Sequence, residues 1–164
     1  MTPSFRIGLG VDSHAFEKNP SARKLMLGGV HFTGERALEG DSDADVILHA
    51  LFNAIHSALG DRGLGFYFSK KDMAGELADS KNMLARAIQT LEKSPYHIAN
   101  VSITLECLTP RIEPKNGDIR KRVAGLLNID VSCVGLTAGT GDHLTAFANG
   151  EGIYCQVMVL LQTR

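Results

Sequence analysis

The spacing of apolar residues switches along this chain between the period of a strand and that of a helix. Apolar and polar residues alternate in the segments 5–16 and 153–161, which predicts a half-buried strand near each end. The remaining segments extend the predicted order to β-β-α-α-β-α-β-β: strands at 24–32, 101–107 and 131–136, and helices that end near Leu59, follow Asp79 and begin at Pro114. Amphipathic helices over a half-buried mixed sheet predict an α/β fold, an α+β sandwich of two layers.

Length and composition limit the classes of protein to consider. A chain of 164 residues with 44% hydrophobic and 21% charged residues predicts one globular domain spanning 1–164. A net charge of −1 without charge runs argues against nucleic-acid or membrane-surface binding, and no apolar run approaches the ~20 residues that span a bilayer. Met1 to Ser4 lead directly into a strand pattern without a signal or transit peptide, so we expect a cytoplasmic protein.

The second face of the last predicted strand is unusually apolar for a surface in contact with water. Its side chains are those of Tyr154, Gln156, Met158, Leu160 and Gln162. Because monomers rarely expose such a continuous strip, we expect an oligomer to cover it.

Two polar side chains share one face at the end of the first predicted strand. Asp12 and His14 lie two residues apart, which places them about 7 Å from each other along a strand. Such a pair is a natural two-ligand edge for a divalent metal, although a surface acid near a surface histidine is the simpler alternative. The small neighbours Gly8 and Gly10 predict that this face is open.

The stretch Asp41 to Leu51 concentrates titratable residues at the start of a predicted helix. Ser42 and Asp45 resemble a capping box, and acids suit the positive end of the helix dipole. At about 100° per residue, His49 lies beside the apolar stripe, on a face shared with Asp45, Phe52 and His56. This position fits a partly exposed surface histidine or a metal ligand, and helical spacing alone leaves both open.

Two histidines and one aspartate would form a three-ligand zinc site with an open fourth position, as in catalytic rather than structural zinc sites. Ala138 to Gly141 offer backbone N–H groups and a hydroxyl, which suit diphosphate oxygens. The following Asp142 could hold a hard cation such as Mg²⁺. The loop 66–78 contains Lys70 and Lys71, which fit either a phosphate-contacting flap or a solvated loop.

These motifs, in this order, resemble the 2-C-methyl-D-erythritol 2,4-cyclodiphosphate synthases of the non-mevalonate isoprenoid pathway. The resemblance runs from end to end and rests on Arg6-Ile7-Gly8, Gly10-x-Asp12-x-His14-x-Phe16, Leu27-Gly28-Gly29-Val30, Ser42-Asp43-x-Asp45-Val46-x-Leu48-His49-Ala50-Leu51, Leu59-Gly60-Asp61-x-Gly63, Ala78-Asp79-Ser80, Asn100-Val101, Pro110-Arg111, Ala138-x-Thr140 and Gly150-Glu151-Gly152-Ile153.

The resemblance implies a homotrimer of ferredoxin-like subunits with active sites between neighbours. Asp12, His14 and His49 would bind zinc, and Mg²⁺ or Mn²⁺ near Asp142 would accompany the substrate diphosphate. The substrate would be a cytidine-diphosphate ester, 4-diphosphocytidyl-2-C-methyl-D-erythritol 2-phosphate. Its 2-phosphate would displace CMP and close a cyclic diphosphate, with Thr140 acting in catalysis.

The resemblance also implies which residues bind the parts of the substrate. The segments 107–113 and 139–142 would hold the cytidine diphosphate, and Asp61 with Gly63 would hold the methylerythritol part. The full set of expected substrate contacts is Asp12, Ser13, His14, Asp41, Ser42, Asp61, Arg62, Gly63, Phe68, Asp72, Cys107, Pro110, Arg111, Gly139, Thr140, Gly141, Asp142, Ala146 and Asn149.

The chain departs from the family pattern at four functional positions. Asp41 stands where the family usually has a catalytic histidine, and its negative charge would oppose catalysis beside phosphates unless it is neutralised or turned away. Lys70 replaces an acid, Gly139 a threonine, and Asn149 an arginine linked to phosphate binding in the central cavity of the trimer. These changes leave three readings: an active synthase with a retuned site, a trimer that binds a nucleotide or isoprenoid diphosphate without cyclising it, and, more weakly, a zinc phosphohydrolase.

Overall fold

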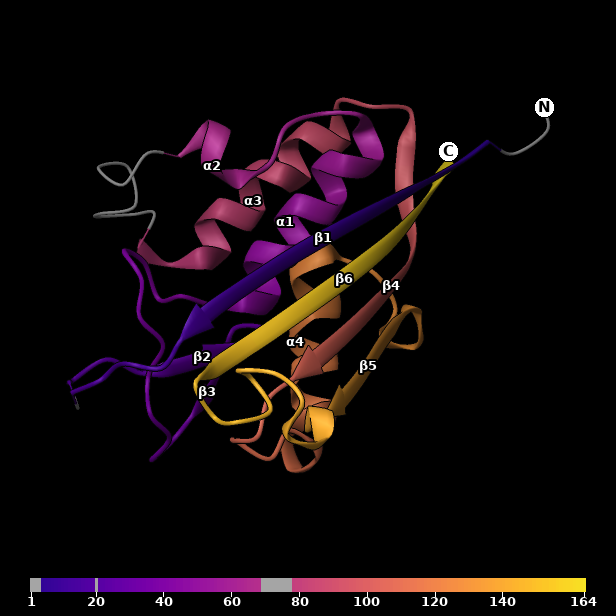
Figure 1. Cartoon of the computed structure of the whole chain (residues 1–164). Helices are drawn as coiled ribbons and strands as arrows, with labels where there is room; N and C mark the ends of the chain where they lie inside the picture. Colours follow the sequence, from indigo (N-terminus) through magenta and orange to yellow (C-terminus); the bar gives the residue numbers. More distant parts are fainter. Residues whose placement is uncertain (1–3, 20, 69–77) are drawn as a thin grey trace.

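A four-stranded mixed sheet forms one layer of the structure, a computed structural model that describes residues 4–19, 21–68 and 78–164. The strands lie in the order β1 (Phe5–Ala15), β6 (Gly152–Thr163), β4 (Tyr96–Glu106) and β5 (Val134–Gly139). β4 and β5 are parallel, and the other neighbouring pairs are antiparallel. The helices α1 (Val46–Leu59), α3 (Ser80–Glu92) and α4 (Asn116–Leu127) cover one face of this sheet (Figure 1). The predicted two-layer sandwich is therefore confirmed.

The connectivity differs from the ferredoxin-like expectation. Ferredoxin-like domains follow the order β-α-β-β-α-β. In this chain α4 connects β4 to the parallel strand β5, and β6 follows β5 directly, so the main sheet follows β-α-β-α-β-β. The ferredoxin-like label was wrong in this respect, because β6 lies between β1 and β4.

A small separate hairpin comes from the second predicted strand. Its two halves are β2 (Leu25–Leu27) and β3 (Val30–Phe32). Gly28 and Gly29 form the turn with φ values of 61° and 74°, a region that favours glycine. The remaining helical segments are short: α2 (Leu64–Tyr67), η2 (Glu113–Lys115), η3 (Val131–Cys133) and η4 (Gly141–His143).

β1 packs directly on the backbone of α1. A Cβ atom at Gly8 would lie 1.9 Å from the carbonyl oxygen of Ala54, and one at Gly10 would lie 2.0 Å from that of Ala50. The prediction that these glycines keep the face open was wrong. They allow strand and helix to approach closely, which brings the end of β1 against the start of α1.

The helix α1 begins later than the acidic stretch and is buried on most sides. Asp45 is its N-cap, and its Oδ1 accepts hydrogen bonds from the N–H groups of Ile47 (3.1 Å) and Leu48 (3.2 Å). The predicted capping box between Ser42 and Asp45 does not form, because Ser42 precedes the helix in a loop. The face expected beside the core is also buried, including His49.

The outer face of the sheet carries the apolar strip expected for an oligomer. Ile7 is 66% exposed and pairs with Leu160, and Leu9 pairs with Met158, which is 45% exposed. The strip therefore spans β1 and β6, and β1 contributes more exposed apolar surface than the sequence indicated. Within the described ranges, no helix is long and apolar enough to cross a membrane.

Candidate metal centre and substrate pocket

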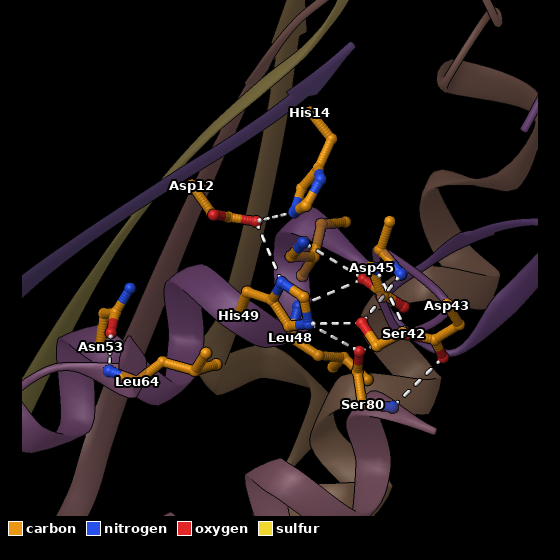
Figure 2. A network of polar contacts seen from close by, with 12 residues as sticks. Asp12, His14, Ser42, Asp43, Asp45, Leu48, His49, Asn53, Leu64 and Ser80 are labelled. Carbon is orange, nitrogen blue, oxygen red and sulfur yellow. Dashed lines mark hydrogen bonds and ion pairs between the residues drawn. The ribbon is translucent and has the colours of Figure 1, made fainter. Parts of the chain in front are cut away.

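Three predicted ligands meet where the end of β1 lies against the first turn of α1. Asp12 Oδ2 lies 3.2 Å from His14 Nε2 and 3.1 Å from His49 Nδ1 (Figure 2). One ligand atom from each of the three residues lies within 4.8 Å of the other two. The structure therefore confirms that two residues of a strand and one residue of a helix form a single cluster.

The protein holds His14 through its other ring nitrogen. His14 Nδ1 lies 2.6 Å from the carbonyl oxygen of Glu39, which can only accept a hydrogen bond, so Nδ1 carries the proton. In the neutral ring, Nε2 then presents a lone pair toward Asp12. Although burial opposes it, the hydrogen bond and charge of Asp12 raise the pKa of His14 above its usual value.

His49 is oriented by a second chain of polar contacts. Its Nε2 lies 2.8 Å from Ser80 Oγ and 3.4 Å from Ser42 Oγ. The Ser80 hydroxyl donates to the carboxylate of Asp43, so its oxygen accepts from His49 Nε2–H. Nδ1 then carries a lone pair, and it faces Asp12 (Figure 2).

A divalent cation fits the arrangement that these contacts impose. When both rings are neutral, two nitrogen lone pairs and a carboxylate oxygen converge on one point, and they repel one another unless a proton or a metal lies between them. Burial works against it, but His14 and His49 lower the pKa of Asp12 when their rings are protonated and donate to it, so the carboxylate is ionised. Outer partners that fix the tautomers of histidine ligands are typical of metal sites.

A pocket of about 180 Å³ lies at the opposite edge of the sheet. Its walls come from the ends of β4 and β5 and the loops that follow, and include the predicted nucleotide contacts Cys107, Pro110, Arg111, Gly139 and Thr140. The Cys107 Sγ is buried, and burial raises the pKa of the thiol to about 11, so it stays neutral. The structure thus brings the two segments predicted to hold the cytidine diphosphate into one cavity.

The segment after β5 begins with Thr140, which lines this pocket, and then leads away toward β6. Gly141 has a φ of 70° and lies against Glu106, leaving no room for a Cβ atom, which would be 2.5 Å from its Oε1. Asp142 is exposed at the start of the turn that leads toward β6, and the predicted contacts Ala146 and Asn149 are exposed farther along it. Neither Ala146 nor Asn149 lines the pocket.

The candidate metal ligands and the 180 Å³ pocket lie at one end of the sheet but at opposite edges. Asp12 on β1 pairs with Cys155, which pairs with Leu105, which pairs with Ala138 on β5. Three strand spacings of about 4.8 Å separate the two edges by roughly 14 Å.

A second cavity, of about 580 Å³, opens beside the metal centre. Asp41 and Ser42 line it together with Arg23 and Lys24. Arg23 donates to the carbonyl oxygens of Gly40 (2.6 Å) and Ser42, which orders the loop that carries Asp41. Asp41 itself is exposed, and the wall of the cavity carries the carboxylates of Asp41, Asp43 and Asp79 beside the two cations.

The turn after α1 places the residues expected to bind the methylerythritol part. Asp61, Arg62 and Gly63 are exposed there. Asn53 anchors this turn, because its Oδ1 accepts from Leu64 N–H (2.8 Å) and its Nδ2 donates to the carbonyl oxygen of Val11 (3.3 Å). The turn is therefore tied to the strand that carries Asp12.

Some residues predicted to contact the substrate do not lie at the site or are not described by the structure. Phe68 is buried and packs edge-on against Phe52 at 5.5 Å between ring centroids, so it supports the turn from the core. Ser13 is exposed on the outer face of β1, away from its neighbours Asp12 and His14. The predicted contact Asp72 lies outside the described residues, as do Lys70 and Lys71, whose loop fitted either a phosphate-contacting flap or a solvated loop.

Sequence reasoning missed the residues that orient the ligands. Ser80 was expected only near a helix start, yet it holds His49 and contacts Asp43. The carbonyl of Glu39 and the amide of Asn53 were not singled out. Their roles depend on contacts between segments that are distant in the sequence, so no local sequence pattern predicts them.

A family model described as the YgbB family matches residues 5–162, nearly the whole chain. The chain belongs to the YgbB family. Two named relatives have similar length: the 2-C-methyl-D-erythritol 2,4-cyclodiphosphate synthase of Leptospira borgpetersenii is 38% identical over 158 residues, covering 95% of this chain and 98% of that one. The synthase of Shouchella clausii is 39% identical over 157 residues, covering 96% and 97%.

Solved structures agree with this membership in the YgbB family. An IspF from Plasmodium falciparum, solved as a CDP complex, has a TM-score of 0.85 and 29% sequence identity to this chain. The likeness covers 98% of this chain and 97% of that one. The fold of this chain is thus that of the IspF structures over its whole length.

Proposed function

We propose that this protein converts 4-diphosphocytidyl-2-C-methyl-D-erythritol 2-phosphate to 2-C-methyl-D-erythritol 2,4-cyclodiphosphate and CMP, as a lyase of isoprenoid precursor biosynthesis. The observation that carries the proposal is the convergence of Asp12, His14 and His49, each oriented by its surroundings, in a chain that matches named synthases from end to end. A trimer that only binds nucleotides is not favoured, because the complete ligand set is present.

The proposed reaction is an intramolecular displacement at phosphorus. An oxygen of the 2-phosphate forms a bond to the phosphorus nearer the methylerythritol. The bond from that phosphorus to the bridging oxygen breaks, and CMP leaves with this oxygen and the bonding electron pair. The protein needs no nucleophile of its own and no water, so it contributes by positioning two anionic groups and reducing their repulsion.

The metal ligands would serve the attacking side. Asp12, His14 and His49 would hold zinc, which supplies positive charge and Lewis acidity to phosphate oxygens. Asp142 would hold Mg²⁺ or Mn²⁺ together with the diphosphate, since hard cations prefer oxygen ligands. Arg23 and Lys24 place two cations near the carboxylate of Asp41 in the wall of the adjoining cavity, which also contains the carboxylates of Asp43 and Asp79.

The nucleotide pocket would serve the leaving side. Backbone groups around Cys107, Pro110 and Arg111 would bind the cytidine, while Gly139 and Gly141 would offer N–H groups to the diphosphate. The Thr140 hydroxyl lines the same pocket and can donate to a phosphate oxygen as charge builds up. The turn at Asp61 to Gly63 would hold the methylerythritol hydroxyls.

A homotrimer is part of this proposal. The proposed metal ligands and nucleotide pocket of one chain lie at opposite edges of its sheet. In a trimer, the metal ligands of one chain would therefore form a shared site with the nucleotide pocket of a neighbouring chain. The exposed apolar strip on β1 and β6, with Ile7, Leu9 and Met158, would be buried between copies. A single domain over 1–164 and a cytoplasmic location stay predictions from the sequence.

The test is CMP release by purified protein supplied with Zn²⁺ and Mg²⁺. We expect CMP release with the native chain, loss of activity after chelation, and recovery when Zn²⁺ is restored. His49→Ala should lose both bound zinc and activity. Bound zinc and bound nucleotide without CMP release would contradict the proposal and favour a binding role.

A further inference from the structure

One face of α1 reaches three different parts of the site. His49 joins the metal cluster, Asn53 anchors the turn before Leu64, and His56 contacts Asp61. The three residues are spaced i, i+4 and i+7, so they follow one another along the helix. The first two have roles in the account above, whereas His56 has none.

Burying His56 in this position costs folding free energy. Its side chain is 2% exposed and stacks on Phe52, with 4.3 Å between ring centroids and 13° between the planes. The ring of Tyr67 meets it edge-on at 4.9 Å. Among the described residues, neither ring nitrogen makes an aligned hydrogen bond, although Nδ1 lies 3.3 Å from Asp61 Oδ2. An apolar ring would fill the same space without burying unpaired nitrogens.

The carboxylate of Asp61 is held on one side by this ring and its neighbour. Oδ2 accepts a hydrogen bond from the Tyr67 hydroxyl at 2.6 Å and faces His56 Nδ1. Oδ1 accepts from the N–H of Arg62 at 2.7 Å, and Asp61 as a residue is exposed on the turn. Oδ2 is therefore held by side chains, whereas the partner of Oδ1 among the described residues is a backbone N–H.

We propose that His56 is a positioning residue, which together with Tyr67 fixes Asp61 Oδ2 so that Oδ1 is presented to a polyol hydroxyl of the substrate. The proposal rests on the function proposed above, which assigns the methylerythritol part to this turn. His56 touches no substrate. It acts through Asp61, so its loss weakens binding of the substrate more than it slows the chemical step.

The experiment compares two substitutions of His56 in the full-length, metal-loaded protein. His56→Phe keeps the aromatic ring on Phe52 but removes the nitrogen that faces Asp61. His56→Asn loses the stacking but places an amide N–H near the position of Nδ1. The measurements are KM and kcat for CMP release, together with the melting temperature Tm.

The two variants should move function and stability in opposite directions. His56→Phe should raise KM about five- to tenfold, with kcat within about twofold, while Tm stays equal or rises because no unpaired nitrogen is buried. His56→Asn should have a lower Tm but a KM near that of the native chain. If KM rises only in the variant whose Tm falls, or if His56→Phe leaves KM unchanged, His56 is a packing residue and the proposal is wrong.

A second readout does not depend on activity. The Tyr67 hydroxyl above all, then the Arg62 N–H and the nearby His56 lower the pKa of Asp61. Carboxyl NMR titration should therefore show a higher pKa for Asp61 in His56→Phe and a larger rise in Tyr67→Phe. Absence of CMP release by the native chain would refute the proposed function, while an unchanged pKa of Asp61 in His56→Phe would separately refute the positioning role.

Discussion

Replacing Ser80 by alanine tests whether the hydrogen bond between Ser80 and His49 contributes to zinc binding. The Ser80 hydroxyl oxygen accepts a hydrogen bond from His49 Nε2–H at 2.8 Å, and its O–H donates to Asp43. Without it, His49 keeps only the longer contact of 3.4 Å with Ser42, and its tautomer and ring orientation are less restricted. Losing such an outer partner typically weakens metal binding 10- to 100-fold.

The geometry favours the lower part of this range, because Ser42 remains as a partial substitute. We expect Ser80→Ala to bind zinc about 10- to 30-fold more weakly, which corresponds to about 1.4–2 kcal/mol. The matched control is Ser42→Ala, which removes the longer of the two contacts and should change zinc affinity less than about threefold.

The assay is equilibrium competition for Zn²⁺ between the protein and a chromophoric chelator. Urea unfolding of the metal-free variants shows whether either substitution damages the fold. Two results would refute the reasoning: zinc affinity unchanged in Ser80→Ala, or a larger loss of affinity in Ser42→Ala than in Ser80→Ala.

Three further predictions concern the framework of the site. The buried Asp45 carboxylate accepts from four backbone N–H groups, so Asp45→Ala should lower the free energy of unfolding by about 4–6 kcal/mol in urea titration; a loss below about 2 kcal/mol would contradict this. Gly10→Ala should lower the free energy of unfolding by at least ~3 kcal/mol and abolish zinc binding, because the added Cβ would collide with the backbone of α1. Gly65→Ala is the control: no atom lies within 4 Å of an added Cβ there, so stability and zinc binding should both be unchanged. In chelator-stripped protein the raised pKa of His14 beside Asp12 means that the folded state binds more protons, so Tm should fall as pH rises above 6.5, and His14→Gln should remove this slope.

The candidate metal ligands could largely be predicted from the sequence. Strand alternation places Asp12 and His14 on one face, and this pairing is local. Helical spacing places His49 on α1 but does not decide between a surface histidine and a metal ligand, because it predicts only one buried stripe. Its second face is buried as well, and that depends on how β1 and α3 pack against it.

The same limitation explains the misreading of Gly8 and Gly10. A missing side chain indicates either open space or close approach of another backbone, and the sequence does not distinguish the two. Here α1 fills the space, with its Ala50 and Ala54 carbonyls against the strand. The glycines therefore determine how near Asp12 lies to His49 rather than how open the face is.

Contacts between distant segments were not predictable. Ser80 is 31 residues from His49, and no spacing rule connects a helix start to a histidine on another helix. The order of the sheet strands was missed for a related reason. The ferredoxin-like fold and the observed one contain the same elements, but they differ in chain order and in the position of β6 between β1 and β4, and pairing of distant strands leaves no local pattern.

Product identity is the most direct test of the proposed reaction. A ³¹P NMR time course with the cytidine-diphosphate substrate, Zn²⁺ and Mg²⁺ follows every phosphorus atom at once. An intramolecular displacement predicts CMP and a cyclic diphosphate in equal amounts, with no inorganic phosphate. Release of inorganic phosphate, or of CMP with an open-chain bisphosphate, would show that water attacks instead and would contradict the account.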